Sequence, residues 1–248
     1  MQRQTQTRTR RSFFGLGVVT WLAACARPFG VSLARSESIT KLRRVVTGTN
    51  RAGRAIIVQN GVSPRVVTTE TLPGLTLVEL WATERIPTLP VAPVDLTTTM
   101  KSFVPGPGGT RFRIVQFPGA STRAFDQEAF RREYLVKAPG LAEAMERQDS
   151  EMHTTDSVDY GVVLSGEITL ELDDGATVRL KQGDCVVQNG TRHAWRNSNT
   201  TPCVMAFVLV GAVRSFARSP CLAGRPHRVV LRTAGSLRRQ ATARWTWC

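Results

Sequence analysis

The chain has 248 residues, of which 42% are hydrophobic and 21% are charged. This length allows one globular domain with a substantial core, or two very small ones. The sequence contains no uninterrupted apolar run of about 18 residues, so a membrane-spanning helix is not expected in its central part. Five cysteines form no CxxC pair, which argues against a disulfide-stapled secreted module.

The formal net charge of +14 comes from the two ends of the chain. Residues 1–36 hold six Arg and residues 214–248 hold eight Arg, and neither segment contains Asp or Glu. Residues 37–213 balance four Lys and fifteen Arg against all nineteen acidic residues. A strongly basic chain would suggest a nucleic-acid or anionic-membrane partner. Because the central segment is neutral, we expect neither partner for it.

The basic leader over 1–36 fits three interpretations. Residues 10–14 (RRSFF) resemble a twin-arginine export signal, and residues 22–25 (LAAC) resemble a lipobox with Cys25 as the lipidated residue. The Arg-rich, acid-free composition is also typical of a mitochondrial transit peptide. The third interpretation is an extension from a wrongly set start. The location therefore stays open between cytoplasmic, mitochondrial and exported.

The tail over 214–248 shows no sustained helix or strand period, and we expect a disordered extension. The domain is thus predicted over 37–213. Its only helical texture lies at 125–148, which Pro139-Gly140 is predicted to break into two pieces.

Short apolar runs separated by turn residues fill the rest of the domain. Gly53 lies in a predicted hairpin turn, and Ile168, Leu170 and Leu172 alternate with polar residues. Such short, regularly spaced strands predict an antiparallel sandwich or barrel. The expected strands cover 42–48, 54–59, 75–83, 111–117, 158–166, 167–172, 176–180, 185–188, 193–197 and 203–210.

The domain contains two histidines, His153 and His193, and each stands at a strand boundary. Asp159 lies six residues after His153, a separation of roughly 20 Å in an extended chain. These two can share a ligand only if residues 155–157 turn the chain back. We expect His193 to point to the same face as Trp195.

At these residues the chain resembles the cupin family of small double-stranded β-helix, or jelly-roll, barrels. The first cupin motif has two histidines one residue apart, then a Glu, and a Gly seven residues after that Glu. Here His153 takes the first histidine position, and Asp159 stands at the Glu position, seven residues before Gly166. Thr155 stands where the second histidine would be, which is a departure from the family.

The second cupin motif places a Gly three residues before a His and an Asn four residues after it. Gly190, His193 and Asn197 match this motif, with Gln188 where Pro is usual. The resemblance covers 150–212 in detail. It implies an all-β fold, a single cupin barrel over 37–213 with a short helical insert, like the short cupins of microbial and fungal small-molecule metabolism.

The resemblance also implies a metal site made of His153, Asp159 and His193, because Thr155 is a poor ligand. Two imidazoles and a carboxylate suffice for a non-haem Fe(II) that keeps positions open for substrate and dioxygen. Mn, Ni or Zn fit the same donors. The alternative is a site without metal, in which a histidine forms hydrogen bonds or acts as a general acid or base.

The function implied by the resemblance is a metal-dependent, dioxygenase-like oxidoreductase acting on a small organic molecule in secondary metabolism. One alternative is a metal-free or Zn-dependent isomerase, dehydratase or cyclase that uses His193 or His153 as acid or base. Another is a non-catalytic small-molecule binder. Family analogy also implies a homodimer paired through sheet edges.

Aromatic and sulfur-containing residues complete the expectations for the domain. Thr155, Tyr160 and Trp195 are predicted to line a substrate pocket, together with Phe207. The two cysteines of the domain, at positions 185 and 203, are expected to be buried free thiols.

Overall fold

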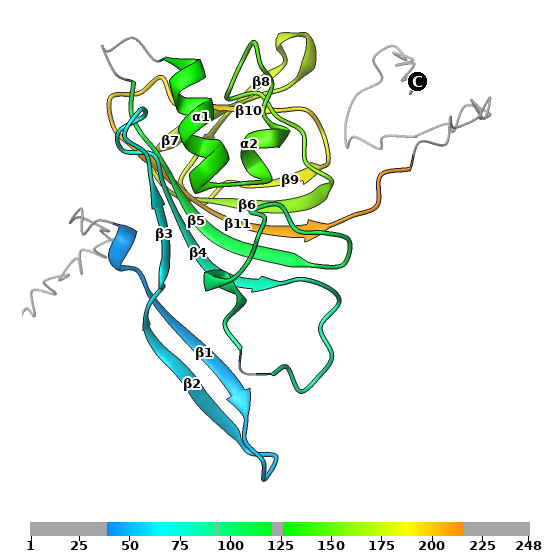
Figure 1. Cartoon of the computed structure of the whole chain (residues 1–248). Coiled ribbons are helices and arrows are strands. Elements are labelled where there is room, and N and C mark those ends of the chain that lie inside the picture. Colours follow the sequence, from blue (N-terminus) through cyan, green and yellow to red (C-terminus); the bar gives the residue numbers. More distant parts are fainter. Residues whose placement is uncertain (1–38, 93, 121–125, 216–248) are drawn as a thin grey trace, which may run out of the picture. The chain divides into compact units, whose positions relative to one another are not determined.

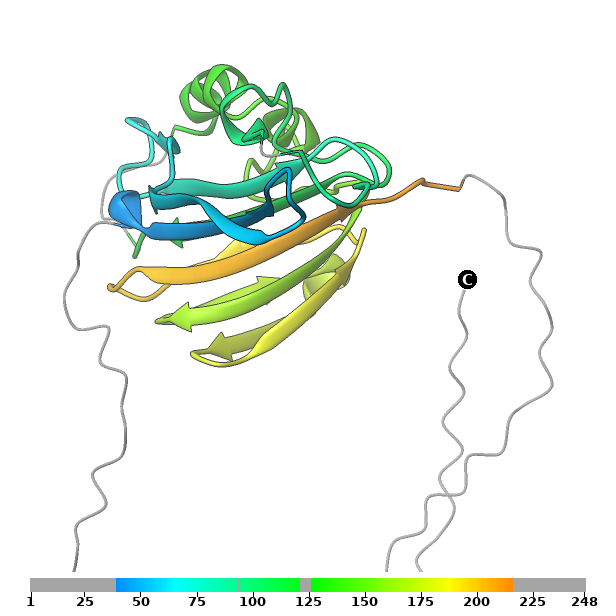
Figure 2. The same ribbon diagram turned by 90° about the horizontal axis from the view of Figure 1, so that it is seen from below.

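The computed structural model describes residues 39–92, 94–120 and 126–215. The expectations for the basic leader and tail therefore lie outside the described residues. The described part is dominated by antiparallel strands (Figures 1 and 2). In chain order the strands are β1 (Arg43–Thr49), β2 (Ala55–Val62), β3 (Arg65–Thr68), β4 (Thr76–Thr83), β5 (Thr110–Phe117), β6 (Ser157–Ser165), β7 (Glu167–Glu171), β8 (Thr177–Lys181), β9 (Cys185–Asn189), β10 (Ala194–Arg196) and β11 (Cys203–Gly211).

These strands form two main sheets and a separate hairpin. The larger sheet has the order β3-β4-β5-β11-β6-β9, the smaller has the order β10-β7-β8, and β1 pairs with β2. The expected hairpin around Gly53 and the expected strand series are confirmed. The prediction of an all-β barrel with a short helical insert is confirmed as well.

The core lies between the two sheets, and alternation in the sequence decides which side chains enter it. Along β11 every second residue is buried, from Cys203 through Met205 and Phe207 to Leu209. Ile168 and Leu170 of β7 pack into the same apolar cluster from the smaller sheet. Hydrophobic burial of the two facing sheets therefore fixes which face of each strand can reach a site.

The helical insert forms two pieces, as predicted. Asp126 caps α1 (Gln127–Lys137), because its Oδ1 accepts a hydrogen bond of 2.9 Å from the Ala129 amide. Pro139-Gly140 separates α1 from α2 (Leu141–Ala144). Phe130 and Tyr134, one turn apart on α1, stack at 4.8 Å and are buried in the core. The insert therefore contributes part of the interior wall.

One expectation about the cysteines is wrong. Cys203 is buried, as expected, but Cys185 is exposed. The reason is topological: β9 is the edge strand of the larger sheet, and the side chain of Cys185 lies on its outer face. An apolar run in the sequence does not distinguish an edge strand from a central one. No helix in the described ranges is long and apolar enough to cross a membrane.

The register of the larger sheet places Gly161, Phe207, Arg113 and Glu79 in one row across β6, β11, β5 and β4. Gly161 has no side chain to fill its place in this row. A Cβ there would lie 2.8 Å from Cγ1 of Val186 and 3.0 Å from Cε1 of Phe207. The glycine therefore makes room for the Phe207 ring.

We predict that Gly161→Ala lowers the free energy of unfolding by about 1–3 kcal/mol, because the added methyl group overpacks the row. Gly61→Ala is the matched control, since a Cβ at Gly61 meets nothing within 4 Å. Urea unfolding of the two variants and of the wild type measures the effect. Equal stabilities of the two variants would contradict this account of Gly161.

Candidate functional site

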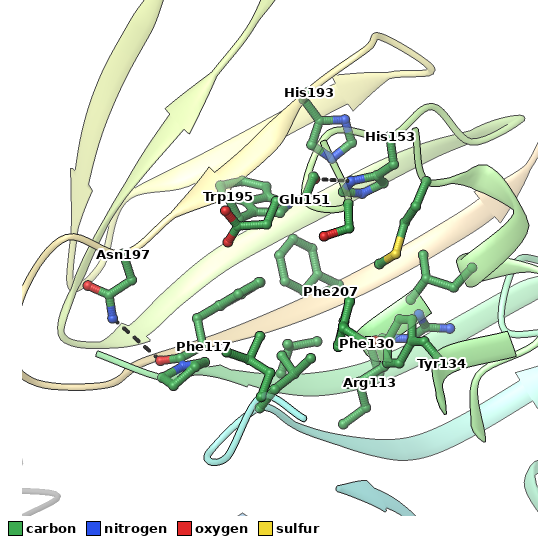
Figure 3. Close-up of a pocket in the computed structure, with 18 of the residues that line it drawn as sticks. Arg113, Phe117, Phe130, Tyr134, Glu151, His153, His193, Trp195, Asn197 and Phe207 are labelled. Carbon is green, nitrogen blue, oxygen red and sulfur yellow. Dashed lines mark hydrogen bonds between the residues drawn. The ribbon is translucent and has the colours of Figure 1, made fainter. Parts of the chain in front are cut away.

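The described residues enclose a cavity of about 270 Å³ on the core side of the larger sheet. Its wall is mostly apolar and aromatic, and includes Leu77, Val115, Phe117, Phe130, Trp195 and Phe207. Figure 3 shows two polar ends to this cavity. His153 and His193 lie at one end, and Arg113 and Tyr134 lie at the other, with the ring of Phe207 between them.

A reciprocal pair of backbone hydrogen bonds brings the two histidines together. The amide of His153 donates to the carbonyl of His193 at 2.9 Å, and the amide of His193 donates to the carbonyl of His153 at 3.0 Å. The two ring centroids are consequently 4.2 Å apart. The rings of Trp195 and His193 form a T-shaped contact with centroids 5.7 Å apart. The expectation that His193 and Trp195 share a face is confirmed.

Each imidazole is held in one tautomer by its own loop. Nδ1 of His153 lies 2.8 Å from the carbonyl oxygen of Glu151, and Nδ1 of His193 lies 2.9 Å from that of Thr191. A carbonyl oxygen only accepts, so both Nδ1 atoms carry the proton. Each Nε2 is therefore left with a lone pair, which is the arrangement found in metal-ligating histidines and in general bases.

Burial keeps both imidazoles neutral. Loss of hydration lowers the pKa of His153 to about 4, and the nearby charge of His193 acts in the same direction. Burial also lowers the pKa of His193. At neutral pH the pair therefore offers lone pairs and no positive charge.

Asp159 lines the same cavity but does not join the histidines in a ligand cluster. Its side chain is buried, and burial raises its pKa against the opposing effects of Ser157 and Arg113. Thr155 is also buried at the cavity, where its hydroxyl accepts a hydrogen bond from Ser157. Within the described ranges, no three His, Cys, Asp or Glu side chains gather closely enough to hold a metal ion.

The donor set thus fits a metal ion only in part. The two Nε2 atoms have the right chemistry for a divalent metal, whereas Asp159 is not assembled with them as a third ligand. The ligand set of His153, Asp159 and His193 stays a prediction.

Comparison with known proteins identifies the domain. A family model described as "Cupin domain" matches residues 141–210, a span that includes both histidines and Asp159. Residues 141–210 are thus a cupin domain.

Curated relatives of this cupin come from fungi. The chain is 41% identical over 128 residues to "Phomopsin biosynthesis cluster protein C'" of Diaporthe leptostromiformis, a match that covers 49% of this chain and 56% of the relative. It is 42% identical over 64 residues to "Cupin-domain-containing oxidoreductase virC" of Hypocrea virens, covering 25% and 33% of the two chains. It is 40% identical over 76 residues to "Cupin-domain-containing oxidoreductase fogC" of Aspergillus ruber, covering 29% and 34%. The matches span about half or less of the length of these relatives.

Some of the predicted pocket residues line the cavity, and one points away from it. Thr155, Trp195 and Phe207 line the cavity, but Tyr160 does not, and that prediction is wrong. The Tyr160 side chain is 51% exposed on the outer face of β6. Side chains alternate along a strand, so the inward position of Asp159 requires that Tyr160 point outward.

Sequence reasoning missed the polar residues at the other end of the cavity. Arg113 and Glu79 form a buried ion pair, with Arg113 Nε 2.8 Å from Glu79 Oε1. Burial raises the pKa of Glu79, while the charge of Arg113 opposes that shift. Tyr134 reaches the same region from α1. The available signal was the alternation of β5, which directs Arg113 inward with Val115 and Phe117.

Arg196 holds the loop that positions His153. Its guanidinium pairs with Glu171 at 2.8 Å, with Glu151 at 2.6 Å and with Asp149. The carbonyl group of Glu151 is the acceptor for Nδ1 of His153. Arg196 therefore ties β10 and β7 to the segment that fixes the tautomer of the imidazole.

We predict that His153 stays neutral down to about pH 4 in the chelator-treated cupin, with the proton on Nδ1. Unfolded chains protonate histidine near pH 6.5, so between pH 6.5 and 4 the unfolded state binds the additional proton. Stability should then fall with decreasing pH across this window, by up to about 3 kcal/mol. NMR of ring-labelled histidine and urea unfolding at several pH values measure both effects. A His153 titration near pH 6.5 would contradict the account.

Proposed function

We propose that this cupin is an enzyme that converts an apolar small molecule of a biosynthetic pathway at its His153–His193 pair. One observation carries the proposal: two neutral imidazoles present free Nε2 atoms at one end of an apolar cavity. Apolar side chains adjoin the reacting end, and the Nδ1 hydrogen bonds fix the direction of each ring. A bound molecule would therefore meet two oriented lone pairs.

The leading reaction class is metal-dependent oxidation, as the sequence resemblance implied. The relatives named as cupin-domain-containing oxidoreductases support this class, and the tautomers of the two histidines support metal binding. Nε2 of His153 and of His193 would hold the ion, Fe(II) first and Mn, Ni or Zn otherwise, with Asp159 as the candidate third ligand. The ion would supply Lewis-acid or dioxygen-activating chemistry.

A metal-free proton transfer is the second candidate, and the absence of a third assembled ligand among the described residues favours it. Here Nε2 of His193 would take a proton from the bound molecule, and the same residue would return it at another atom. This describes an isomerase, dehydratase or cyclase. Apolar surroundings favour neutral imidazole over imidazolium, which keeps the base in its active form.

Assembly into a homodimer remains part of the proposal. Sheet edges are available for pairing, because β3 and β9 are the outermost strands of the larger sheet. Size-exclusion chromatography with light scattering would measure the oligomeric state.

We predict that the full chain, purified without chelator, holds near-stoichiometric divalent metal that disappears in His193→Ala. His227→Ala is the matched control, because it removes a histidine outside the described residues. Metal content is measured by mass spectrometry, and oxygen uptake is measured with candidate substrates. A protein that binds no metal even after reconstitution would overturn the oxidoreductase class and favour proton transfer. Ligand binding without conversion under any condition would overturn the enzyme proposal.

A further inference from the structure

The far end of the cavity carries two buried polar side chains that the proposed chemistry does not use. Arg113 comes from β5 and is 3% exposed, and Tyr134 comes from α1 and is 2% exposed. Both line the cavity, and Figure 3 shows them together at the end opposite His153 and His193. Two separate elements thus place hydrogen-bond donors at one end of the cavity.

The hydrogen bonds of Arg113 leave part of its guanidinium without a partner. Nε faces Oε1 of Glu79 at 2.8 Å, and Nη2 donates to the carbonyl of Phe103. Within the described part of the chain, Nη1 makes no hydrogen bond. A guanidinium has five N–H groups, so at least the two on Nη1 are available to an acceptor in the cavity.

The hydroxyl of Tyr134 is in the same situation. Among the described residues it has no hydrogen-bond partner, although its ring stacks on Phe130. Burial raises its pKa, with a smaller effect in the same direction from Glu79 and an opposing effect from Arg113. The hydroxyl therefore stays protonated and can donate.

Arg113 belongs to a cluster of ionisable side chains around this end of the cavity. Three guanidinium groups, those of Arg65, Arg111 and Arg113, lie close enough to lower the pKa of Glu79. Arg111 is paired with Glu84 at 3.0 Å, whereas Arg65 has no ion pair within the described ranges and lies over the ring of Phe103. Its guanidinium carbon is 5.3 Å from the ring centroid. With Asp159, which also feels the charge of Arg113, three guanidinium groups are accompanied by three carboxyl groups here.

Asp159 is the other carboxylate that feels the charge of Arg113. No ion pair within 4 Å joins these two residues in the described structure, and Asp159 belongs to a different strand, β6. The free donors of Arg113 are therefore not taken up by the protein's own acid.

We propose that Arg113 and Tyr134 form a subsite for the carboxylate group of a small molecule whose apolar body fills the cavity. Charge-assisted hydrogen bonds from a guanidinium to a carboxylate are stronger than neutral ones, and the phenol adds a third donor. Phe130 and Phe207 contact the apolar body between the two ends. The substrate class rests on the proposed function, because the opposite end of the same molecule would then meet the histidine pair.

The test compares binding of 4-propylbenzoate with binding of 4-propylbenzamide to the full chain. Calorimetry gives both affinities, and we expect the carboxylate to bind at least tenfold more tightly. Tyr134→Phe should lower benzoate affinity about tenfold, the loss expected for a hydrogen bond to a charged group, and should change benzamide affinity less than twofold. Tyr160→Phe is the matched control, because it removes the chain's only other tyrosine hydroxyl from the outer face.

Arg113 needs a paired variant, because removing it alone leaves Glu79 buried without its partner. Arg113→Met combined with Glu79→Leu replaces the ion pair by apolar side chains of similar size, a change that buried pairs often tolerate. Circular dichroism checks that this double variant folds. We expect it to lose most of the preference for benzoate over benzamide and to keep only the part that the Tyr134 hydroxyl provides.

Labelling with ¹³C-tyrosine gives an independent readout that does not depend on stability. The chain has two tyrosines, so the Tyr134→Phe spectrum assigns both Cζ signals. Benzoate should shift the Tyr134 signal and leave the Tyr160 signal in place, and benzamide should shift the Tyr134 signal much less.

Three results would each overturn the subsite: equal affinity of the wild type for the two probes, no binding of either probe, or unchanged benzoate affinity in Tyr134→Phe. None of these results concerns conversion or metal content, which the His193→Ala experiment measures. Failure of the subsite and failure of the proposed function are therefore distinguishable.

Discussion

The site depends on the two backbone hydrogen bonds that join His153 to His193. They connect the segment after α2 to the start of β10, two parts of the chain 40 residues apart in sequence. Once this contact forms, both rings lie side by side. In each case the Nδ1–H group donates a hydrogen bond to the carbonyl oxygen two residues earlier, that of Glu151 or of Thr191. The repeated local geometry gives the pair two equivalent, free Nε2 atoms.

The arginines on either side of His193 hold in place the segment that leads to His153, residues 146–151. Arg192 pairs with Glu146 and with Asp173 at 2.9 Å, and Arg196 pairs with Asp149, Glu151 and Glu171. Partly exposed ion pairs contribute little stability individually, about 0–1 kcal/mol. Their effect here is geometric, because they join β10 to the segment that carries the acceptor for His153. Networks of this kind restrict the rings more than they stabilise the fold.

The sequence was sufficient for the parts of the structure that depend on local pattern. Alternation and turn residues predicted the strands, Pro139-Gly140 predicted the break between the helices, and the motif around His193 predicted its inward direction. It was harder to predict where individual side chains lie in three dimensions. The side chain of Tyr160 could have been excluded from the pocket by its alternation with Asp159, whereas the exposure of Cys185 required knowing that β9 is an edge strand.

The alternation of β5 places Arg113 on the inward face, but it does not indicate which partners the side chain meets there. Its partner Glu79 lies on a neighbouring strand, 34 residues earlier, and Tyr134 arrives from a helix. The sequence could equally not show that Asp159 stays apart from the histidine pair, since that depends on how far the chain bends after His153. Long-range geometry of this kind is set by sheet register, which strand patterns alone do not specify.

The buried pair of Glu79 and Arg113 also bears on why the cavity has this shape. Desolvating two charges costs free energy that their attraction only partly recovers, and apolar residues of the same volume would serve the fold as well. Arg113, the member of the pair that lines the cavity, is thus better explained by what it presents to that cavity. Gly161 leads to the same conclusion, because it leaves space for the Phe207 ring that separates the two polar ends. The wall favours an elongated apolar molecule with a polar group at each end over one that is apolar throughout.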